Sequence, residues 1–202
     1  MMTNLALVVV DVQNDFCPGG SLSVKHGDKV VGHINAMIER FESEGLPIFF
    51  TRDWHPADHC SFHEQGGIWP PHCVRETKGA KFHTNLRVPA DATIISKATK
   101  ADKEAYSGFD GTDLSARLKA LRVTRVIVGG LATDYCVKNT VLDALHDGFE
   151  VMILKDCIKG VEVRKGDSAQ AIQEMKANGA VMIQSKDAVN KLRRRVTVLS
   201  SS

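Results

Sequence analysis

Short apolar runs alternate with amphipathic stretches along most of this chain. Six of the runs have the length of a β-strand, and they cover residues 5–10, 47–51, 92–96, 125–128, 151–154 and 180–183. The first run, LALVVV, is apolar at every position, which is typical of a strand that is covered on both faces. The pattern therefore predicts six strands, the first of them fully buried.

The stretches between these runs show the spacing of amphipathic helices. From 27 to 44, apolar residues recur every three or four positions, and Gly45 ends the pattern. Similar patterns predict helices around 114–121, over 134–146 and over 165–177. Strands that alternate with helices are typical of a parallel sheet with helices on both faces. The sequence thus predicts a three-layer α/β fold with a mostly parallel six-stranded sheet.

Length and composition narrow the class of protein. The 202 residues suit one domain spanning 1–202, with 43% hydrophobic and 25% charged residues. A net charge of +2 is too small to indicate nucleic acid as a partner. The five scattered cysteines, with neither a basic leader nor a long apolar run, favour free thiols in a cytoplasmic protein away from membranes. The length and composition are compatible with a homo-oligomer.

Chemically reactive residues follow four of the predicted strands. Asp11 follows the first, Asp53 the second and Lys97 the third, and Cys136 lies shortly beyond the fourth. In parallel sheets, ligands bind beyond the carboxyl ends of the strands. One aspartate at such a place is more often a helix cap, but two acids, a lysine and a thiol at one edge favour a catalytic site. Cys157, after the fifth strand, has no activating neighbour and is expected to be structural.

Cys136 is the candidate nucleophile. The segment GGLATDYCV places it in the first turn of a predicted helix, just after the cap candidates Thr133 and Asp134. The positive end of a helix and its free N–H groups are expected to lower the pKa of the thiol. No histidine follows a neighbouring strand, so Asp11 is the candidate base and Lys97 its ion-pair partner. The alternatives are a buried structural cysteine and a surface lysine.

A second group of polar residues suggests a metal site. Asp53 and His55 are two positions apart, so in an extended backbone their side chains point to the same side and can share one ion. The irregular stretch 53–90 adds the donors His59, Cys60, His63, Glu64, His72 and Cys73. A mixed set of carboxylate and imidazole ligands suits a catalytic metal ion more than a closed structural site. The residues alone leave the further ligands open.

Six segments of the chain also form a set of motifs. They are VVVDVQNDFCPGGSL, FFTRDWHPADHCSF, GGIWPPHCV, the region of Lys97, AYSGFDGT and GGLATDYCV. Together they resemble the nicotinamidases within the isochorismatase-like hydrolases, and they cover most of the chain. The pattern GxxTxxCV is shared across that superfamily, whereas DWHPxxHxSF with WPPHC is much more specific. The chain departs from the resemblance at Arg75-Glu76-Thr77, where nicotinamidases often have a Gln-Gly-Thr turn, so the shape of this loop is not predicted.

The resemblance implies the catalytic residues. It assigns a triad to Asp11, Lys97 and Cys136, in agreement with the residues found at the strand ends. It also assigns an oxyanion hole to the backbone N–H groups of Ala132 and Cys136, with a cis peptide bond before Ala132.

The resemblance further implies the ligands of one divalent metal ion and the walls of a pyridine pocket. The metal ligands are Asp53, His55 and His72, with His59 and Glu64 left open as additional partners. Zinc is favoured over manganese or iron. The pocket residues are Phe16, Trp69 and Tyr106, although an aromatic residue can equally serve core packing alone.

The activity implied by the resemblance is hydrolysis of nicotinamide to nicotinate and ammonia through a cysteine thioester, as a step of NAD salvage. The nearest alternative is a metal-independent amidase that acts on another small carbamoyl compound. A non-catalytic metal-binding module is a third reading, which would tolerate loss of Cys136. The basic segment 191–195 is expected to be the solvated face of a final helix rather than a nucleic-acid patch.

Overall fold

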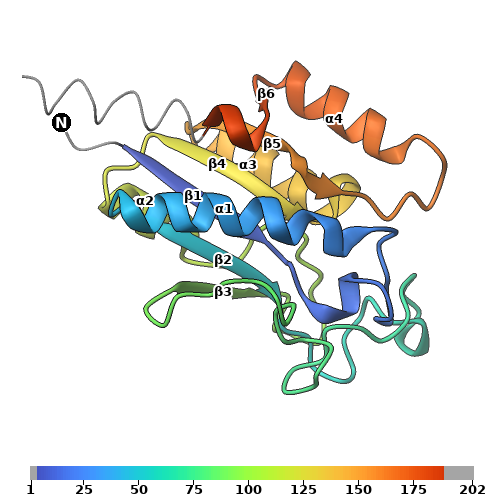
Figure 1. Ribbon diagram of the computed structural model, residues 1–202. Coiled ribbons are helices and arrows are strands. Elements are labelled where there is room, and N and C mark those ends of the chain that lie inside the picture. The colour runs from blue at the N-terminus through green and yellow to red at the C-terminus, as the bar shows by residue number, and fades with distance from the viewer. Residues whose placement is uncertain (1–3, 189–202) are drawn as a thin grey trace, which may run out of the picture.

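A six-stranded parallel sheet forms the centre of the protein in the computed structural model, which describes residues 4–188 (Figure 1). The strands are β1 (Leu5–Val10), β2 (Ile48–Asp53), β3 (Thr93–Lys97), β4 (Arg125–Leu131), β5 (Glu150–Lys159) and β6 (Val181–Ile183). Their order is β3-β2-β1-β4-β5-β6, and every neighbouring pair is parallel. The predicted sheet is confirmed, and it is parallel throughout rather than mostly. The basic segment 191–195 lies outside the described residues.

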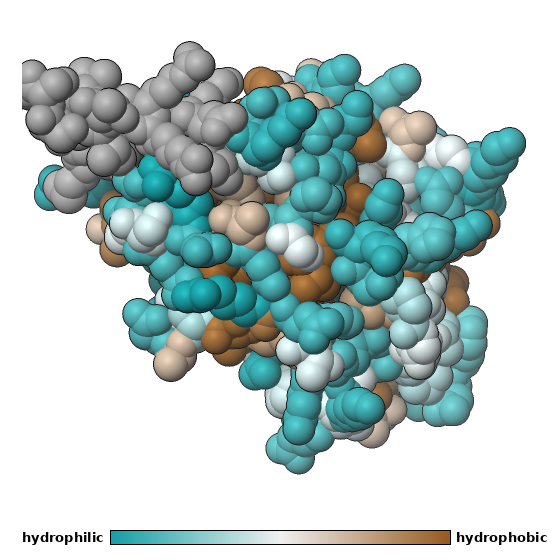
Figure 2. Space-filling view, in the orientation of Figure 1, coloured by the Kyte–Doolittle hydropathy of each residue, from teal (hydrophilic) through white to brown (hydrophobic). Residues whose placement is uncertain are grey.

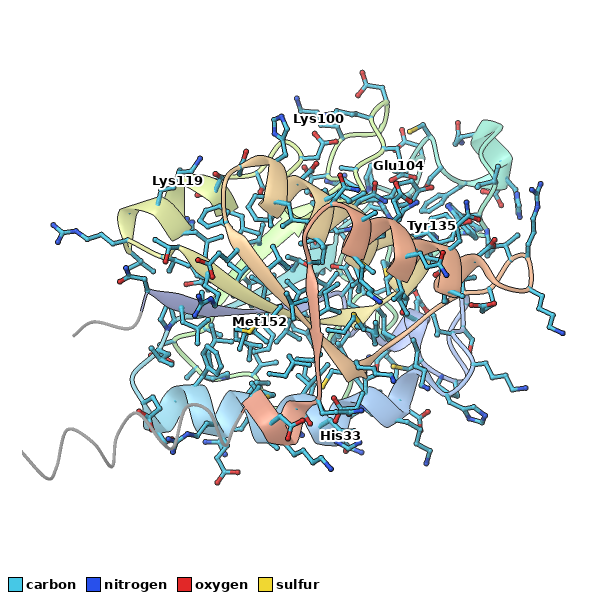
Figure 3. The ribbon with its side chains drawn as sticks, turned by 90° about the horizontal axis from the view of Figure 1, so that it is seen from above. His33, Lys100, Glu104, Lys119, Tyr135 and Met152 are labelled. Atoms are coloured by element: carbon cyan, nitrogen blue, oxygen red, sulfur yellow. The ribbon has the colours of Figure 1, made fainter. Side chains whose placement is uncertain are left out.

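Helices cover both faces of this sheet. They are α1 (Val30–Ser43), α2 (Leu114–Ala120), α3 (Lys138–His146) and α4 (Asp167–Ala177). Seen from above, α1 lies on one side of the sheet and the other three lie on the opposite side (Figure 3). The side chains of β1 alternate between the two layers: Leu7 packs with the α1 residues and Val8 with those of α2 and α3. The predicted three-layer α/β fold is confirmed.

The surface agrees with the composition of the chain. The face shown in Figure 2 is mainly hydrophilic, with smaller apolar areas between the polar side chains. Within residues 4–188, no helix combines the length and the apolar composition that crossing a membrane requires.

The ends of β4 and β5 differ from the prediction. Both strands continue beyond the expected 125–128 and 151–154, with an irregularity in their pairing between Val128 and Gly130. A Cβ atom on Gly130 would lie 1.9 Å from the carbonyl oxygen of Val10, and the φ of Gly130 is 135°. Only glycine permits so close an approach of β4 to β1. The approach brings the turn after β4 next to the end of β1.

The irregular stretch 54–90 packs beside the carboxyl ends of β1 and β2 (Figure 1). Isolated bridges hold it, joining His55 to Val74, Phe62 to Trp69 and Gln13 to Phe82. Short 3-10 helices lie in or near it, namely η1 (Asn14–Phe16), η2 (Gly27–Lys29) and η3 (His63–Gln65). Single bridges leave no sequence periodicity, which explains why this stretch gave no pattern of helices or strands.

Candidate active site

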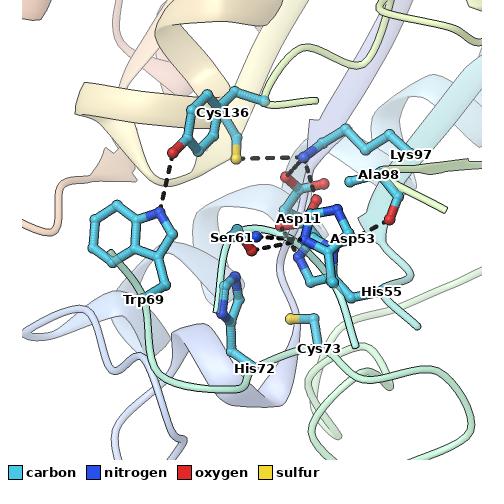
Figure 4. A network of polar contacts seen from close by, with 12 residues as sticks. Asp11, Asp53, His55, Ser61, Trp69, His72, Cys73, Lys97, Ala98 and Cys136 are labelled. Carbon is cyan, nitrogen blue, oxygen red and sulfur yellow. Dashed lines mark hydrogen bonds and ion pairs between the residues drawn. The ribbon is translucent and has the colours of Figure 1, made fainter. Parts of the chain in front are cut away.

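Four predicted residues meet at the carboxyl edge of the sheet (Figure 4). The Lys97 ammonium lies at their centre, with its Nζ 2.9 Å from Asp11 Oδ2 and 3.4 Å from Cys136 Sγ. It also forms an ion pair with Asp53 Oδ1. Asp53 and Lys97 are the last residues of β2 and β3 and face each other in register, so they end the strands rather than follow them. The topology thus brings together side chains that are far apart in sequence.

Asp11 has the surroundings of a general base. The chain turns sharply at this residue, with a φ of 47°, and Thr51 Oγ1 donates a hydrogen bond to Asp11 Oδ1 at 2.6 Å. Burial raises the pKa of Asp11 to about 6, even though Lys97 acts in the opposite direction. A carboxylate with this pKa can take up and release a proton near neutral pH.

Lys97 is completely buried and charged. Burial alone would lower its pKa, but Asp11 and Asp53 together hold the pKa of the ammonium well above its usual value. One cation therefore lies between two carboxylates in the interior. Removal of the cation would leave both carboxylates without a counter-charge.

Cys136 lies in a π-helical turn, η4 (Thr133–Val137), that precedes α3. The sequence predicted an ordinary helix start and a lowered pKa, and this pKa prediction is wrong. Burial raises the pKa of the Cys136 thiol well above its usual value, against the opposing effect of Lys97. Only 5% of the residue is exposed, so loss of hydration outweighs the helix N-terminus. Cys136 is a neutral thiol at rest and needs a proton acceptor.

The turn itself is held by the backbone of Ala132. The N–H groups of Tyr135 and Val137 both donate to the Ala132 carbonyl oxygen, at 3.1 and 3.0 Å. The peptide bond between Leu131 and Ala132 is cis, as the family resemblance implied.

Asp53, His55 and His72 form a buried group of metal-ligand type. One donor atom of each lies within 4.8 Å of the others. His55 Nδ1 is 3.2 Å from the Ala98 carbonyl oxygen, and its buried Nε2 has no hydrogen-bond partner among residues 4–188. Burial lowers the pKa of His55 to about 4, so the ring is neutral and has a free lone pair. His72 Nδ1 is likewise 2.8 Å from the Pro70 carbonyl oxygen. These residues fit a divalent metal ion, because ligating histidines commonly use the other ring nitrogen in this way.

The loop that carries His72 is fixed against the strand segment that carries His55. The His55 N–H donates to the Cys73 carbonyl oxygen at 3.1 Å, and the Arg75 N–H donates to the His55 carbonyl oxygen at 2.8 Å. The chain then makes a tight turn, closed by a bond from the Thr77 N–H to the Val74 carbonyl oxygen. The departure from the family motif at 75–77 therefore lies in a turn outside the group of donors.

The two residues left open as extra ligands lie outside this group. Both ring nitrogens of His59 have partners, with Nδ1 at 2.7 Å from Ser61 Oγ and Nε2 at 3.2 Å from the Lys103 carbonyl oxygen. Glu64 is exposed in η3. Among the described residues, the donor group that contains imidazoles is Asp53, His55 and His72. A second group, Asp11, Asp53 and Cys136, surrounds the Lys97 ammonium.

Aromatic side chains enclose a cavity of about 20 Å³ beside Cys136. It is lined by the predicted pocket residues and by others, in all Phe16, Leu22, Asp53, Trp69, His72, Tyr106, Ala132, Tyr135, Cys136 and Val161. Trp69 Nε1 donates to the Tyr106 hydroxyl at 3.0 Å. This volume holds about one water molecule, so the aromatic side chains must move apart to admit a ring.

Sequence reasoning missed Tyr135 as a wall of this cavity. Its ring centroid is 4.9 Å from that of Trp69 and 5.4 Å from that of Tyr106. A tyrosine next to the nucleophilic cysteine in the sequence does not by itself indicate a cavity wall. Tyr135 lies in the π-helical turn η4, which the sequence did not predict.

Comparison with known proteins agrees with this geometry. The family model described as the Isochorismatase domain matches residues 5–187. The chain belongs to the isochorismatase family. Within this family, the nicotinamidase of Escherichia coli (strain K12) is 40% identical over 198 residues, which cover 88% of this chain and 93% of that one.

Solved structures within the isochorismatase family are also similar. The pyrazinamidase of Pyrococcus horikoshii in complex with zinc is 51% identical, with a TM-score of 0.86, and the match covers 90% of this chain and 99% of that one. PnC1 from L. infantum in complex with nicotinate is 36% identical, with a TM-score of 0.85, and the match covers 91% and 94%. The resemblance to nicotinamidases, first drawn from the motifs, is confirmed.

Proposed function

We propose that this protein is a nicotinamidase, which hydrolyses nicotinamide to nicotinate and ammonia for NAD salvage. The observation that carries the proposal is that one aromatic cavity is lined both by Cys136 and by Asp53 and His72 of the metal-ligand group. A pyridine carboxamide has a ring nitrogen and an amide carbon, which match these two features. The 40% identical nicotinamidase of E. coli supports the same activity.

In the first half of the reaction, Asp11 takes the proton of Cys136. Asp11 Oδ2 is suited to this role because, apart from its ion pair with Lys97, it has no hydrogen-bond partner in the described part of the chain. The thiolate attacks the amide carbon, and the backbone N–H groups of Ala132 and Cys136 bind the oxyanion. Asp11 then gives its proton to the leaving nitrogen. The C–N bond breaks, ammonia leaves and a thioester remains on Cys136.

In the second half, Asp11 removes a proton from water, which attacks the thioester carbon. The C–S bond breaks, nicotinate leaves and the proton returns to the Cys136 sulfur. Lys97 keeps its charge throughout and stabilises Asp11 and the thiolate. This cycle needs no histidine base.

The metal site is proposed to orient the substrate. A divalent ion held by Asp53, His55 and His72 would supply a coordination position for the pyridine nitrogen. We propose zinc, because the donor set suits it and the similar pyrazinamidase of P. horikoshii was solved in complex with zinc. Phe16 and Trp69 then flank the flat ring, and Tyr106 supports Trp69 through their hydrogen bond.

Metal removal separates this proposal from the metal-independent amidase. Chelation is expected to lower kcat/KM for nicotinamide by about 100-fold, and added zinc is expected to restore it. His72→Ala should show the loss without a chelator, whereas His63→Ala, which changes an exposed histidine in the same loop, should not. Nicotinate formation measured by chromatography reports the rates. Nicotinamide turnover that is unaffected by chelation and by His72→Ala would contradict the proposed role of the metal ion, and hydrolysis of another small carbamoyl compound in its place would favour the metal-independent amidase.

The pKa of Asp11 predicts the pH dependence. Asp11 must be ionised to accept the Cys136 proton, and burial raises its pKa to about 6. We therefore expect kcat/KM to be constant above that pH and to fall tenfold per unit as the pH drops below about 6. The profile is measured with zinc content checked at each pH, so that metal loss is not mistaken for protonation. A rate that stays flat down to about pH 5 would contradict Asp11 as the base.

A further inference from the structure

Gln13 has a buried amide with three hydrogen bonds, none of which the proposed mechanism uses. Its Oε1 accepts the backbone N–H of Asp53 at 2.8 Å, and its Nε2 donates to the backbone carbonyl oxygen of Asp53 at 2.8 Å. The same Nε2 donates to the Ala80 carbonyl oxygen at 2.9 Å. The side chain is 0% exposed, so it is part of the protein interior.

The sheet explains why Asp53 needs this partner. β1 pairs with β2 only as far as Thr51, because the chain turns away at Asp11, while β2 continues to Asp53. Successive residues of a central parallel strand direct their N–H and C=O groups to opposite neighbours, so residues two apart face the same neighbour. Thr51 and Asp53 therefore both face the β1 side, and at Asp53 no strand remains there. The Gln13 amide takes the place of the missing strand.

The backbone of Asp53 determines where its carboxylate lies. Oδ1 pairs with Lys97, and Oδ2 is 3.7 Å from His55 Nε2. The hydrogen bond from Gln13 Nε2 to the Ala80 carbonyl oxygen connects the backbone of Asp53, through Gln13, to the loop that follows His72. A single amide thus connects the carboxylate ligand with the segment that carries an imidazole ligand.

We propose that Gln13 is a positioning residue for the metal site, which holds Asp53 in the orientation that serves both Lys97 and the histidines. The inference rests on the metal site of the proposed function. Gln13 neither lines the aromatic cavity nor belongs to the Asp53-His55-His72 group, so its effect is on metal affinity through Asp53.

The test measures zinc affinity by competition with a chromogenic chelator, independently of nicotinamide turnover. Gln13→Met, which keeps the side-chain length but removes the amide, is expected to weaken zinc binding about 10- to 100-fold. Gln13→Asn, whose amide is one carbon shorter, should give a smaller loss. Asn14→Ala is the matched control, because the Asn14 amide also donates to the 78–81 segment, at the Lys78 carbonyl oxygen, but does not contact Asp53. Its zinc affinity should stay within about threefold of wild type.

Thermal unfolding of the metal-free proteins provides the second measurement. A merely structural role for Gln13 would lower Tm and leave the zinc affinity of the folded protein unchanged. If Gln13→Met folds and binds zinc as tightly as wild type, the proposal is overturned. If Gln13→Met does not fold, the same result for Gln13→Asn overturns it. Equal loss in Asn14→Ala also overturns it. If the affinities follow the expected order but wild type does not hydrolyse nicotinamide, the role of Gln13 holds and the proposed function fails.

Discussion

Replacement of Cys136 by alanine is expected to lower kcat for nicotinamide hydrolysis by at least about 10⁴-fold. The thiol is the only proposed nucleophile, and Cys136 lines the aromatic cavity with Lys97 Nζ 3.4 Å from its sulfur. Cys136→Ser should be nearly as inactive, because a buried hydroxyl holds its proton far more tightly than a thiol does. Zinc affinity should be unchanged in both variants, since the sulfur is outside the Asp53-His55-His72 group.

A second thiol provides the matched control for this loss. Cys60 is half-buried in the loop near His59, and Cys60→Ser should retain wild-type turnover. With wild type, rapid acid quenching followed by mass spectrometry is expected to find a nicotinoyl group on the peptide that contains Cys136. Full activity in Cys136→Ala would contradict the thiolate mechanism, and it would leave an attack by metal-activated water to be considered.

Replacement of Lys97 by methionine is expected to cost about 3–5 kcal/mol in the free energy of unfolding at neutral pH. The substitution fills a similar volume but leaves Asp11 and Asp53 as neighbouring buried carboxylates without a cation. Their folded-state pKa values then rise above the unfolded ones. A group with a raised pKa stabilises the fold at low pH and loses that contribution as the pH increases. The deficit relative to wild type should therefore be larger at about pH 7.5 than at about pH 5.

Denaturant unfolding of the metal-free proteins at both pH values measures this effect. Lys103→Met is the control, because Lys103 forms an exposed ion pair with Asp110 that is expected to contribute little. The double variant Lys97→Met with Asp11→Asn should recover part of the loss, since it removes one unpaired charge. A small, pH-independent change in Lys97→Met would show that Lys97 does not hold the two carboxylates as described.

Most of the fold follows from local patterns in the sequence. The apolar run of β1 and the helical spacing in α1 identify elements that are buried on two faces and on one face respectively. Prediction from the sequence fails where tertiary contacts override the local pattern of apolar residues. β5 continues to Lys159 because it pairs with β4 again at Ile158, although Lys155 and Asp156 interrupt its apolar run. The close approach at Gly130 likewise depends on a neighbouring strand, which no local pattern reveals.

The sequence predicted which residues lie at the candidate site. It did not predict how neighbouring residues change their pKa values or complete the site. The rule that ligands bind beyond parallel strands found Asp11, Lys97 and Cys136. The pKa of Cys136 was predicted in the wrong direction, because the helix position is visible in sequence while complete burial is not. Tyr135 and Gln13 were missed for the same reason: their roles depend on partners distant in the chain.

The most direct test of the central claim is product formation from nicotinamide by the zinc-loaded wild-type protein. Ammonia and nicotinate are measured together, with Cys136→Ala as the blank. We predict that the two products form in equal amounts with wild type and that neither forms above background with the variant. A folded, zinc-loaded wild-type protein that releases neither product would contradict the assignment as a nicotinamidase.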